Sequence, residues 1–218
     1  MPEAVKAVSS AFLRARRWLL MPVLRLIVRV MKADPWERFE KRVPLKFFSE
    51  RAAEFESYFQ RSSAVGVKSV DDVQRWLMEC TYVSDQVEFG VPEHWQHPSD
   101  FEGRRRGDCE DHALWAWRKL IEVGEDAEFV VGLSQRADGT WGGHAWVHVR
   151  GETGVRMFEA GEKSLDRMLR PLTDEEIQRE YFPHLGVDSA FRRHVYWGWL
   201  IDLAEPKLRP NVPSNTKG

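Results

Sequence analysis

The chain has 218 residues, the length of one domain with extensions, and its 43% hydrophobic and 30% charged residues are typical of a globular protein. Its formal net charge of -2 gives no electrostatic argument for nucleic-acid binding. Its only cysteines are Cys80 and Cys109, which excludes a disulfide framework.

Residues 1–44 are predicted to be a basic helical extension. The apolar run from Phe12 to Met31 is interrupted by arginines. A spanning helix needs about 20 largely uncharged residues, so this run is not expected to cross a membrane. It also lacks the small-residue cleavage site of a secretory signal. We therefore expect a cytoplasmic protein, or one that lies at the periphery of a membrane.

The pattern of this extension indicates a basic amphipathic helix with a bend at Pro22. Two interpretations remain open. Residues 1–32 could contact a membrane surface or a partner protein. Alternatively, the helix packs on its own domain, and this second interpretation is slightly favoured.

The next segments are predicted to be helix and loop. Residues 33–66 are expected to be helical and then irregular, and a helix follows from Ser69, which forms a capping-box pattern with Asp72. The apolar face of that helix includes Cys80, which is therefore predicted to be a small buried residue. Residues 84–107 are polar and contain Pro and Gly, which predicts a long loop, often a functional feature in compact domains.

A second helix is predicted from Asp108 onward, with an apolar face and a stop at Gly124. Three strands are expected after it, forming an antiparallel meander. They comprise residues 128–134, 144–150 and 155–160, and turns separate them at Asp138-Gly139 and at residues 151–154.

The last part of the chain is predicted to contain a helix capped by Thr173 with Glu176. Residues 190–203 follow as an aromatic helix or strand. Residues 206–218 are polar and contain proline, so we predict a flexible tail.

Cys109 is the predicted nucleophile. A thiol attacks well only as a thiolate, and a helix N-terminus or a nearby imidazolium lowers its pKa. Asp108 is a good N-cap residue, so Cys109 falls in the first turn, where the helix dipole favours negative charge. Its backbone N–H is one of the unpaired donors of that turn and could help to hold an oxyanion.

His144 is the predicted general base, and Glu159 is predicted to orient it. Strand alternation places His144 and Trp146 on one face. If a two-residue turn joins the strands, Arg150 pairs with Val155, and His144 and Glu159 become diagonal neighbours on the same face. A slip of one residue would separate them onto opposite faces.

These residues carry a resemblance to a known family. The block Gly-Asp-Cys-Glu-Asp at residues 107–111 and the strand Gly143-His144-Ala145-Trp146 resemble the transglutaminase-like superfamily, especially the bacterial transglutaminase-like cysteine proteinases. A segment with Trp and Pro before the cysteine, residues 91–98, is similar too. The resemblance covers roughly residues 69–162. The family usually has Asp as third catalytic member, whereas this chain offers Glu159.

The resemblance implies an α+β, papain/transglutaminase-like fold, in which the catalytic helix packs on an antiparallel sheet over residues 45–205. It also implies that Trp95 or Gln96 assists the oxyanion. We expect a peptidase or amidase with a Cys109–His144–Glu159 triad that acts on a protein or peptide substrate. The alternatives are transglutaminase-type acyl transfer from protein glutamine, and a low-turnover binding or assembly module of the same fold.

No metal or other cofactor is expected, and calcium and zinc are the two alternatives. Some relatives bind calcium through acids flanking the cysteine, and Asp108, Glu110 and Asp111 match those types, but capping of the helix start is the favoured interpretation. A zinc site of Cys109, His112 and a strand histidine is disfavoured. His144 and His148 lie roughly 13 Å apart on a strand and cannot easily share one ion.

Overall fold

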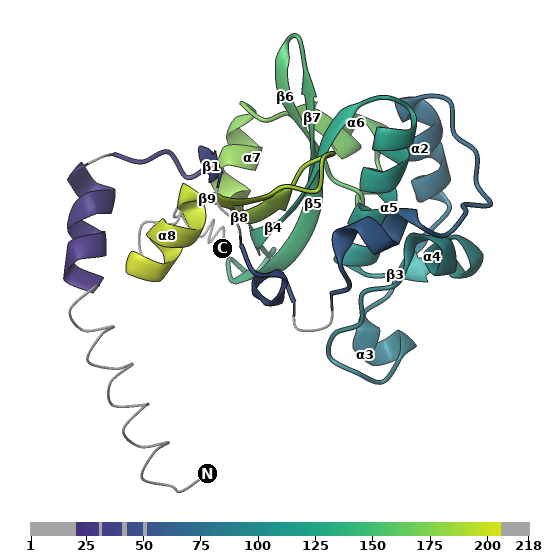
Figure 1. Ribbon diagram of the computed structural model, residues 1–218, viewed down its shortest axis with the longest axis horizontal. Helices are drawn as coiled ribbons and strands as arrows, with labels where there is room; N and C mark the ends of the chain where they lie inside the picture. Colours follow the sequence, from purple (N-terminus) through teal and green to yellow (C-terminus); the bar gives the residue numbers. More distant parts are fainter. Residues whose placement is uncertain (1–20, 31, 41–42, 50–51, 206–218) are drawn as a thin grey trace, which may run out of the picture.

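The computed structural model describes residues 21–30, 32–40, 43–49 and 52–205. A seven-stranded antiparallel sheet in the order β1-β9-β8-β4-β5-β6-β7 forms its centre. The strands are β1 (Arg38–Glu40), β4 (Asp126–Gln135), β5 (Trp141–Gly151), β6 (Gly154–Phe158), β7 (Leu169–Pro171), β8 (Tyr181–Val187) and β9 (Arg193–Tyr196). Helices cover both sides of the sheet, so the predicted α+β class is confirmed (Figure 1).

The predicted meander β4-β5-β6 is confirmed together with its register. Arg150 pairs with Val155 and Gly151 with Gly154, as a two-residue turn requires. Gly154 has a φ of 115°, a conformation that glycine adopts without steric cost. This pairing therefore places the start of β5 beside the residues that follow β6.

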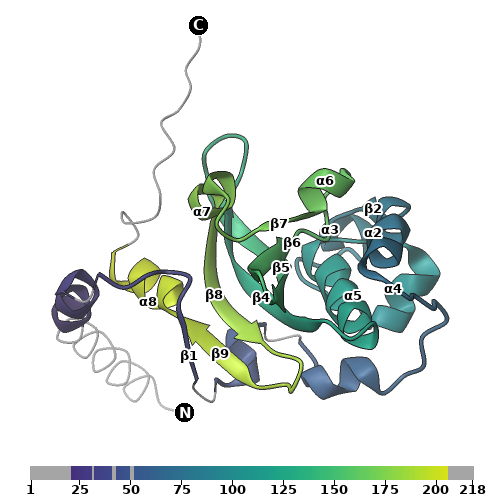
Figure 2. The same cartoon turned by 90° about the horizontal axis from the view of Figure 1, so that it is seen from above.

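Helix α5 (Cys109–Glu122) packs against β4 and β5 and forms the largest core cluster with them. Ala113, Trp115 and Trp117 of this helix are completely buried. Helix α2 (Val70–Met78) lies beside α5 on the same side of the sheet, as Figure 2 shows. Its N-cap Ser69 accepts a hydrogen bond from Asp72 N, and Cys80 is buried just after its end, both as predicted.

The prediction of a long loop at residues 84–107 is wrong in part. The segment contains α3 (Asp85–Glu88), α4 (Pro98–Arg104) and β3 (Arg106–Gly107). Proline often marks a loop, but Pro98 is the first residue of α4, where its missing N–H costs no hydrogen bond. Strand β3 pairs in parallel with β2 (Thr81–Tyr82), so this segment is held against the chain before α3.

Strand β8 was not predicted, because Pro183 and Gly186 interrupt its apolar pattern. The sheet accommodates it beside β4 with a register shift between Val131 and Gly132. Such an irregularity is where a central strand tolerates proline. The placement of β8 brings its first residue, Tyr181, close to β5.

The remaining elements are short. They are η1 (Leu45–Phe47), η2 (Phe55–Phe59), α6 (Leu165–Met168), α7 (Glu175–Glu180) and α8 (Trp197–Ala204). The cap predicted at Thr173 is wrong by one residue, since the Asp174 side chain accepts from Glu176 N at 2.9 Å. Residues 190–203 contain both predicted possibilities, β9 followed by α8.

Residues 21–30 are helical and pack on α8. Val28 is buried in a cluster with Ile201, Arg25 Nε donates to Ala204 O at 2.9 Å, and Arg29 pairs with Glu205 at 2.6 Å. For these residues, packing on the chain's own domain is confirmed. The bend predicted at Pro22 depends on residues 1–20, which lie outside the described residues. The predicted tail at 206–218 lies outside them as well.

A second side of the same helix carries exposed apolar residues. They recur at helical spacing and are Val23, Leu26, Ile27 and Val30. None of the described helices is both long and apolar enough to cross a membrane. Membrane or partner contact through residues 1–32 stays a prediction. The predicted start of the catalytic domain at residue 45 stays a prediction too. Strand β1, which precedes that residue, pairs with β9 of the sheet.

Candidate active site

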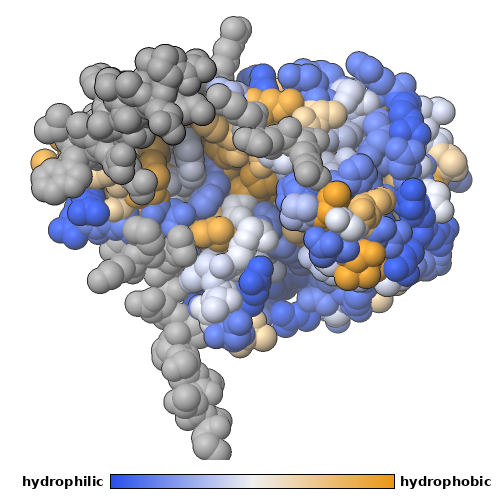
Figure 3. Space-filling view, turned by 90° about the horizontal axis from the view of Figure 1, so that it is seen from below, coloured by the Kyte–Doolittle hydropathy of each residue, from blue (hydrophilic) through white to orange (hydrophobic). Residues whose placement is uncertain are grey.

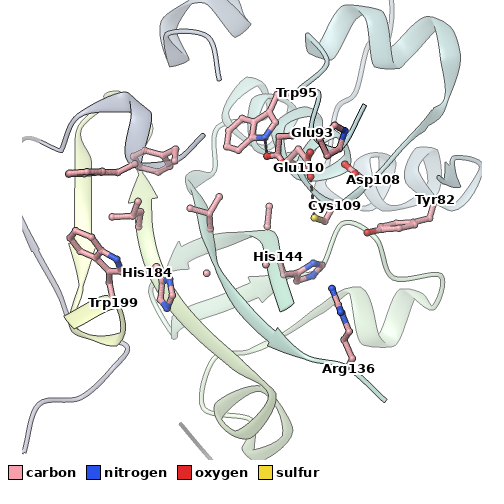
Figure 4. A pocket seen from close by; sticks show the side chains of 18 residues that line it. Tyr82, Glu93, Trp95, Asp108, Cys109, Glu110, Arg136, His144, His184 and Trp199 are labelled. Atoms are coloured by element: carbon pink, nitrogen blue, oxygen red, sulfur yellow. Dashed lines mark hydrogen bonds between the residues drawn. The ribbon is translucent and has the colours of Figure 1, made fainter. Parts of the chain in front are cut away.

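A pocket of about 500 Å³ opens where the N-terminus of α5 meets β4, β5 and β8. Cys109 and His144 both line it, and Figure 4 shows their side chains entering it from opposite sides. Phe47, Leu185 and Trp199 form an apolar wall at one end. On the face in Figure 3 the described surface is mostly hydrophilic, with hydrophobic residues in separate patches.

Cys109 is the first residue of α5, as predicted, and is partly buried. Its thiol donates to Glu110 Oε2 at 3.2 Å. Ala145, the residue after His144, lines the same pocket as the sulfur. The nucleophile candidate therefore lies against the start of β5.

The predicted lowering of the thiol pKa is wrong for this arrangement of charges. Burial, followed by the neighbouring Glu110 and Asp108 carboxylates, raises the pKa of Cys109 well above its ordinary value. The helix dipole and a nearby imidazolium were the expected causes of a lower pKa. Desolvation and like charge outweigh them, so the resting group is a thiol.

His144 and Glu159 are brought together as the register predicted. His144 Nε2 lies 2.8 Å from Glu159 Oε2. Burial alone lowers the pKa of His144, but the Glu159 carboxylate outweighs it and the net pKa is raised. Since Nε2 is engaged with the carboxylate, Nδ1 is the nitrogen left for a reaction in the pocket.

Two further hydrogen bonds hold the side chain of Glu159, which is longer than that of the Asp usual at this position in the family. Tyr181 donates its hydroxyl to Oε2 at 3.2 Å, and Gly161 N donates to Oε1 at 3.2 Å. The Trp146 ring stacks beside His144 with centroids 6.0 Å apart. Tyr181 was missed from the sequence, because it belongs to the unpredicted strand β8.

The two oxyanion candidates have their side-chain donors engaged elsewhere. Trp95 Nε1 donates to Glu93 Oε1 at 2.7 Å, although the residue lines the pocket. Gln96 is buried, and its Nε2 donates to Asp111 Oδ2 and to Arg106 O. This geometry does not supply a free donor from either side chain beside Cys109.

Tyr82 is a site residue that the sequence patterns did not reveal. It lines the pocket, and its hydroxyl points toward Cys109 (Figure 4). Burial of the hydroxyl and the nearby Cys109 raise the pKa of Tyr82. Its strand β2 is only two residues long, too short for a periodicity signal.

A cluster of three carboxylates includes Asp108, the residue next to Cys109 in the chain. Asp85, Asp108 and Asp111 each place an oxygen within 4.8 Å of the other two. The Asp108 side chain makes no capping hydrogen bond to α5, contrary to the favoured interpretation. Burial and neighbouring charge raise the pKa of Asp85 to about 6 and that of Asp111 to about 7.

The zinc hypothesis finds no support in the described part of the chain, where the grouped potential metal ligands include no histidine. His112 is buried between Tyr82 and Phe101, and its Nδ1 lies 2.8 Å from Asp108 O. His148 is buried too, and its Nε2 accepts a hydrogen bond from Trp146 Nε1 at 2.9 Å. Both are core histidines in this structure.

Comparison with known proteins yields one family model, described as bacterial transglutaminase-like cysteine proteinase, which matches residues 46–169. No curated protein matches. Among solved structures, calcium-bound LapG of Legionella pneumophila is 16% identical, covering 62% of this chain and 70% of that chain with a TM-score of 0.43. A transglutaminase ("TGase") is 20% identical, covering 56% and 33% with a TM-score of 0.33.

Proposed function

This chain belongs to the bacterial transglutaminase-like cysteine proteinases, as its motifs predicted, and on that premise we propose that it hydrolyses peptide or amide bonds with a Cys109–His144–Glu159 triad. Family membership makes it a cysteine peptidase; the identity of the triad is the proposal. One observation carries it: His144, bound to Glu159 at 2.8 Å, faces the same pocket as Cys109.

The proposed reaction begins when His144 Nδ1 takes the proton of the Cys109 thiol as the sulfur attacks the substrate carbonyl. The imidazolium then returns that proton to the leaving amine, and a thioester to Cys109 remains. Water attacks the thioester while His144 accepts its proton; the carbon–sulfur bond then breaks, the acid product leaves, and His144 returns the proton to the Cys109 sulfur. Glu159 stabilises the imidazolium and keeps the ring oriented throughout.

Hydrolysis and transamidation differ only in the second acyl acceptor. In water enriched in oxygen-18, the chain should cleave members of a peptide library, and the new carboxyl termini should carry the heavy isotope. With excess glycine ethyl ester, mass spectrometry should still find mainly the acid product. A dominant amine adduct would instead establish a transamidase, and unchanged peptides with an unreactive Cys109 would favour the binding module.

We further propose that Ca²⁺ occupies the cluster of Asp85, Asp108 and Asp111. Oxygen ligands from several carboxylates suit this ion. Asp85 Oδ1 and Asp108 Oδ1 are buried without a hydrogen-bond partner, so the donor set fits a cation. A bound Ca²⁺ would offset the negative charge that these groups place beside Cys109.

Calcium removal should slow alkylation of Cys109. Without the ion the carboxylates hold the thiol pKa high, and at neutral pH each unit of pKa changes the thiolate fraction about tenfold. Iodoacetamide labelling with Ca²⁺ and with EGTA measures this, and calorimetry measures binding of the ion itself. Asp85→Asn should weaken binding, whereas Asp71→Asn, at an exposed acid of α2, should not. Equal labelling rates and no binding heat would refute the calcium proposal.

A further inference from the structure

Tyr82 is fixed beside the nucleophile by backbone pairing. Tyr82 and Gly107 are partners in the parallel β2-β3 pair, and Val83 N donates to Gly107 O at 2.8 Å. Gly107 lies two residues before Cys109. The backbone that carries the Tyr82 side chain is therefore tied to the residues that lead into α5.

Two neighbours fix the direction of the Tyr82 ring. It stacks on His112, with ring centroids 5.9 Å apart and an interplanar angle of 26°. Gly161, just after β6, lies beside the ring, since a Cβ built there would be in ordinary van der Waals contact with it, 3.7 Å from Tyr82 Cδ2. The hydroxyl end enters the pocket next to Cys109, as Figure 4 shows, while 51% of the residue stays exposed.

A group that reaches the sulfur can also reach the oxyanion. Attack by Cys109 bonds the carbonyl carbon to sulfur, so the negative oxygen forms one bond away from that carbon. Effective oxyanion donors lie about 2.7–3.1 Å from this oxygen. A phenol hydroxyl is a neutral donor at neutral pH, and the Tyr82 hydroxyl already points toward Cys109 in the pocket that both residues line (Figure 4).

We propose that the Tyr82 hydroxyl, together with the backbone N–H of Cys109, donates to the oxyanion of the tetrahedral intermediate. This inference rests on the proposed nucleophile. When the intermediate collapses, the carbonyl reforms, the leaving group departs and the Tyr82 proton stays on its own oxygen. Trp95 Nε1 and Gln96 Nε2 do not compete for this role, because both already donate to other acceptors.

Two probes of Cys109 separate this role from an effect on the thiol. Acylation by p-nitrophenyl acetate passes through an oxyanion, whereas alkylation by iodoacetamide displaces iodide at a saturated carbon and forms none. Tyr82→Phe removes only the hydroxyl. It should slow acylation on the order of 10²-fold, the usual effect of losing one oxyanion donor, and change alkylation by less than about threefold.

The matched control is Thr81→Val, which removes a hydroxyl from the other, also exposed, residue of β2 and should leave both rates unchanged. Both rates are read as modification of the Cys109 peptide in the full chain with Ca²⁺ present. Equal slowing of acylation and alkylation in Tyr82→Phe would mean that Tyr82 acts on the thiol, and faster acylation would mean that it blocks the site. Either result overturns the proposal, as does unchanged acylation.

Failure of the proposed nucleophile gives a different result. If the wild-type Cys109 is neither alkylated nor acylated faster than a free thiol, the catalytic proposal fails, and the role of Tyr82 fails with it. If wild-type Cys109 is acylated rapidly but Tyr82→Phe behaves like the wild type, only the Tyr82 proposal fails.

Discussion

Replacing Cys109 by alanine should reduce peptide hydrolysis about 10⁶-fold, to the background rate, because removal of the attacking atom in a nucleophile–base system costs about that much. The thiol is partly buried in the pocket and makes one side-chain hydrogen bond, to Glu110. Its loss should therefore leave the fold intact. The measurement is kcat on the best peptide from the library, with thermal unfolding followed in parallel.

Cys80 provides the matched control for that experiment. Cys80 is 4% exposed, and its thiol donates to Trp76 O at 3.6 Å at the end of α2. Cys80→Ala should lower the free energy of unfolding on the order of 1 kcal/mol while kcat stays at the wild-type value. Retention of activity in Cys109→Ala, or its loss in Cys80→Ala, would mean that the nucleophile is misassigned.

Glu159→Gln should lower kcat about 10³- to 10⁴-fold, because the amide stabilises the wrong tautomer of His144. Gly161 N donates to Oε1, so the amide oxygen is favoured there and the amide NH₂ takes the place of Oε2. That NH₂ then donates to His144 Nε2, which forces the ring proton onto Nδ1. A ring protonated on Nδ1 cannot accept the proton of the thiol.

The neighbouring carboxylate supplies the control for this prediction. Glu162→Gln changes a group that pairs with Arg167 at 3.1 Å, outside the pocket, and should leave kcat unchanged. Glu159→Asp keeps the charge but shortens the side chain, so its activity should lie between the wild type and Glu159→Gln. A fully active Glu159→Gln enzyme, measured by kcat, would remove Glu159 from the triad.

Local patterns predicted the elements that carry the reacting groups. The N-cap position of Asp108, the periodicity of α5 and the alternation of β5 are set by residues close together in the chain. The β5-β6 register follows from a turn and from alternation, so the sequence predicts the approach of Glu159 to His144. These features depend on hydrogen bonds over short sequence separations.

Contacts between distant segments were not predictable in the same way. Strand β8 carries Tyr181 to Glu159, and the β2-β3 pair carries Tyr82 to Cys109. Asp85 N donates a hydrogen bond to Asp108 Oδ2, although the two residues are 23 positions apart in the chain. Their patterns are short or interrupted by proline, and their positions depend on which surfaces pack together.

The sequence by itself determined the nucleophile candidate, its helix, the strand-borne His144 and the family. Only the tertiary structure decided the electrostatic setting of Cys109. The helix dipole is local and favours a thiolate, and the adjacent Glu110 and Asp108 carboxylates are local and oppose it. Burial, the largest cause of the raised thiol pKa, is a product of packing. Desolvation depends on every group that covers an atom, so no local pattern around Cys109 could report it.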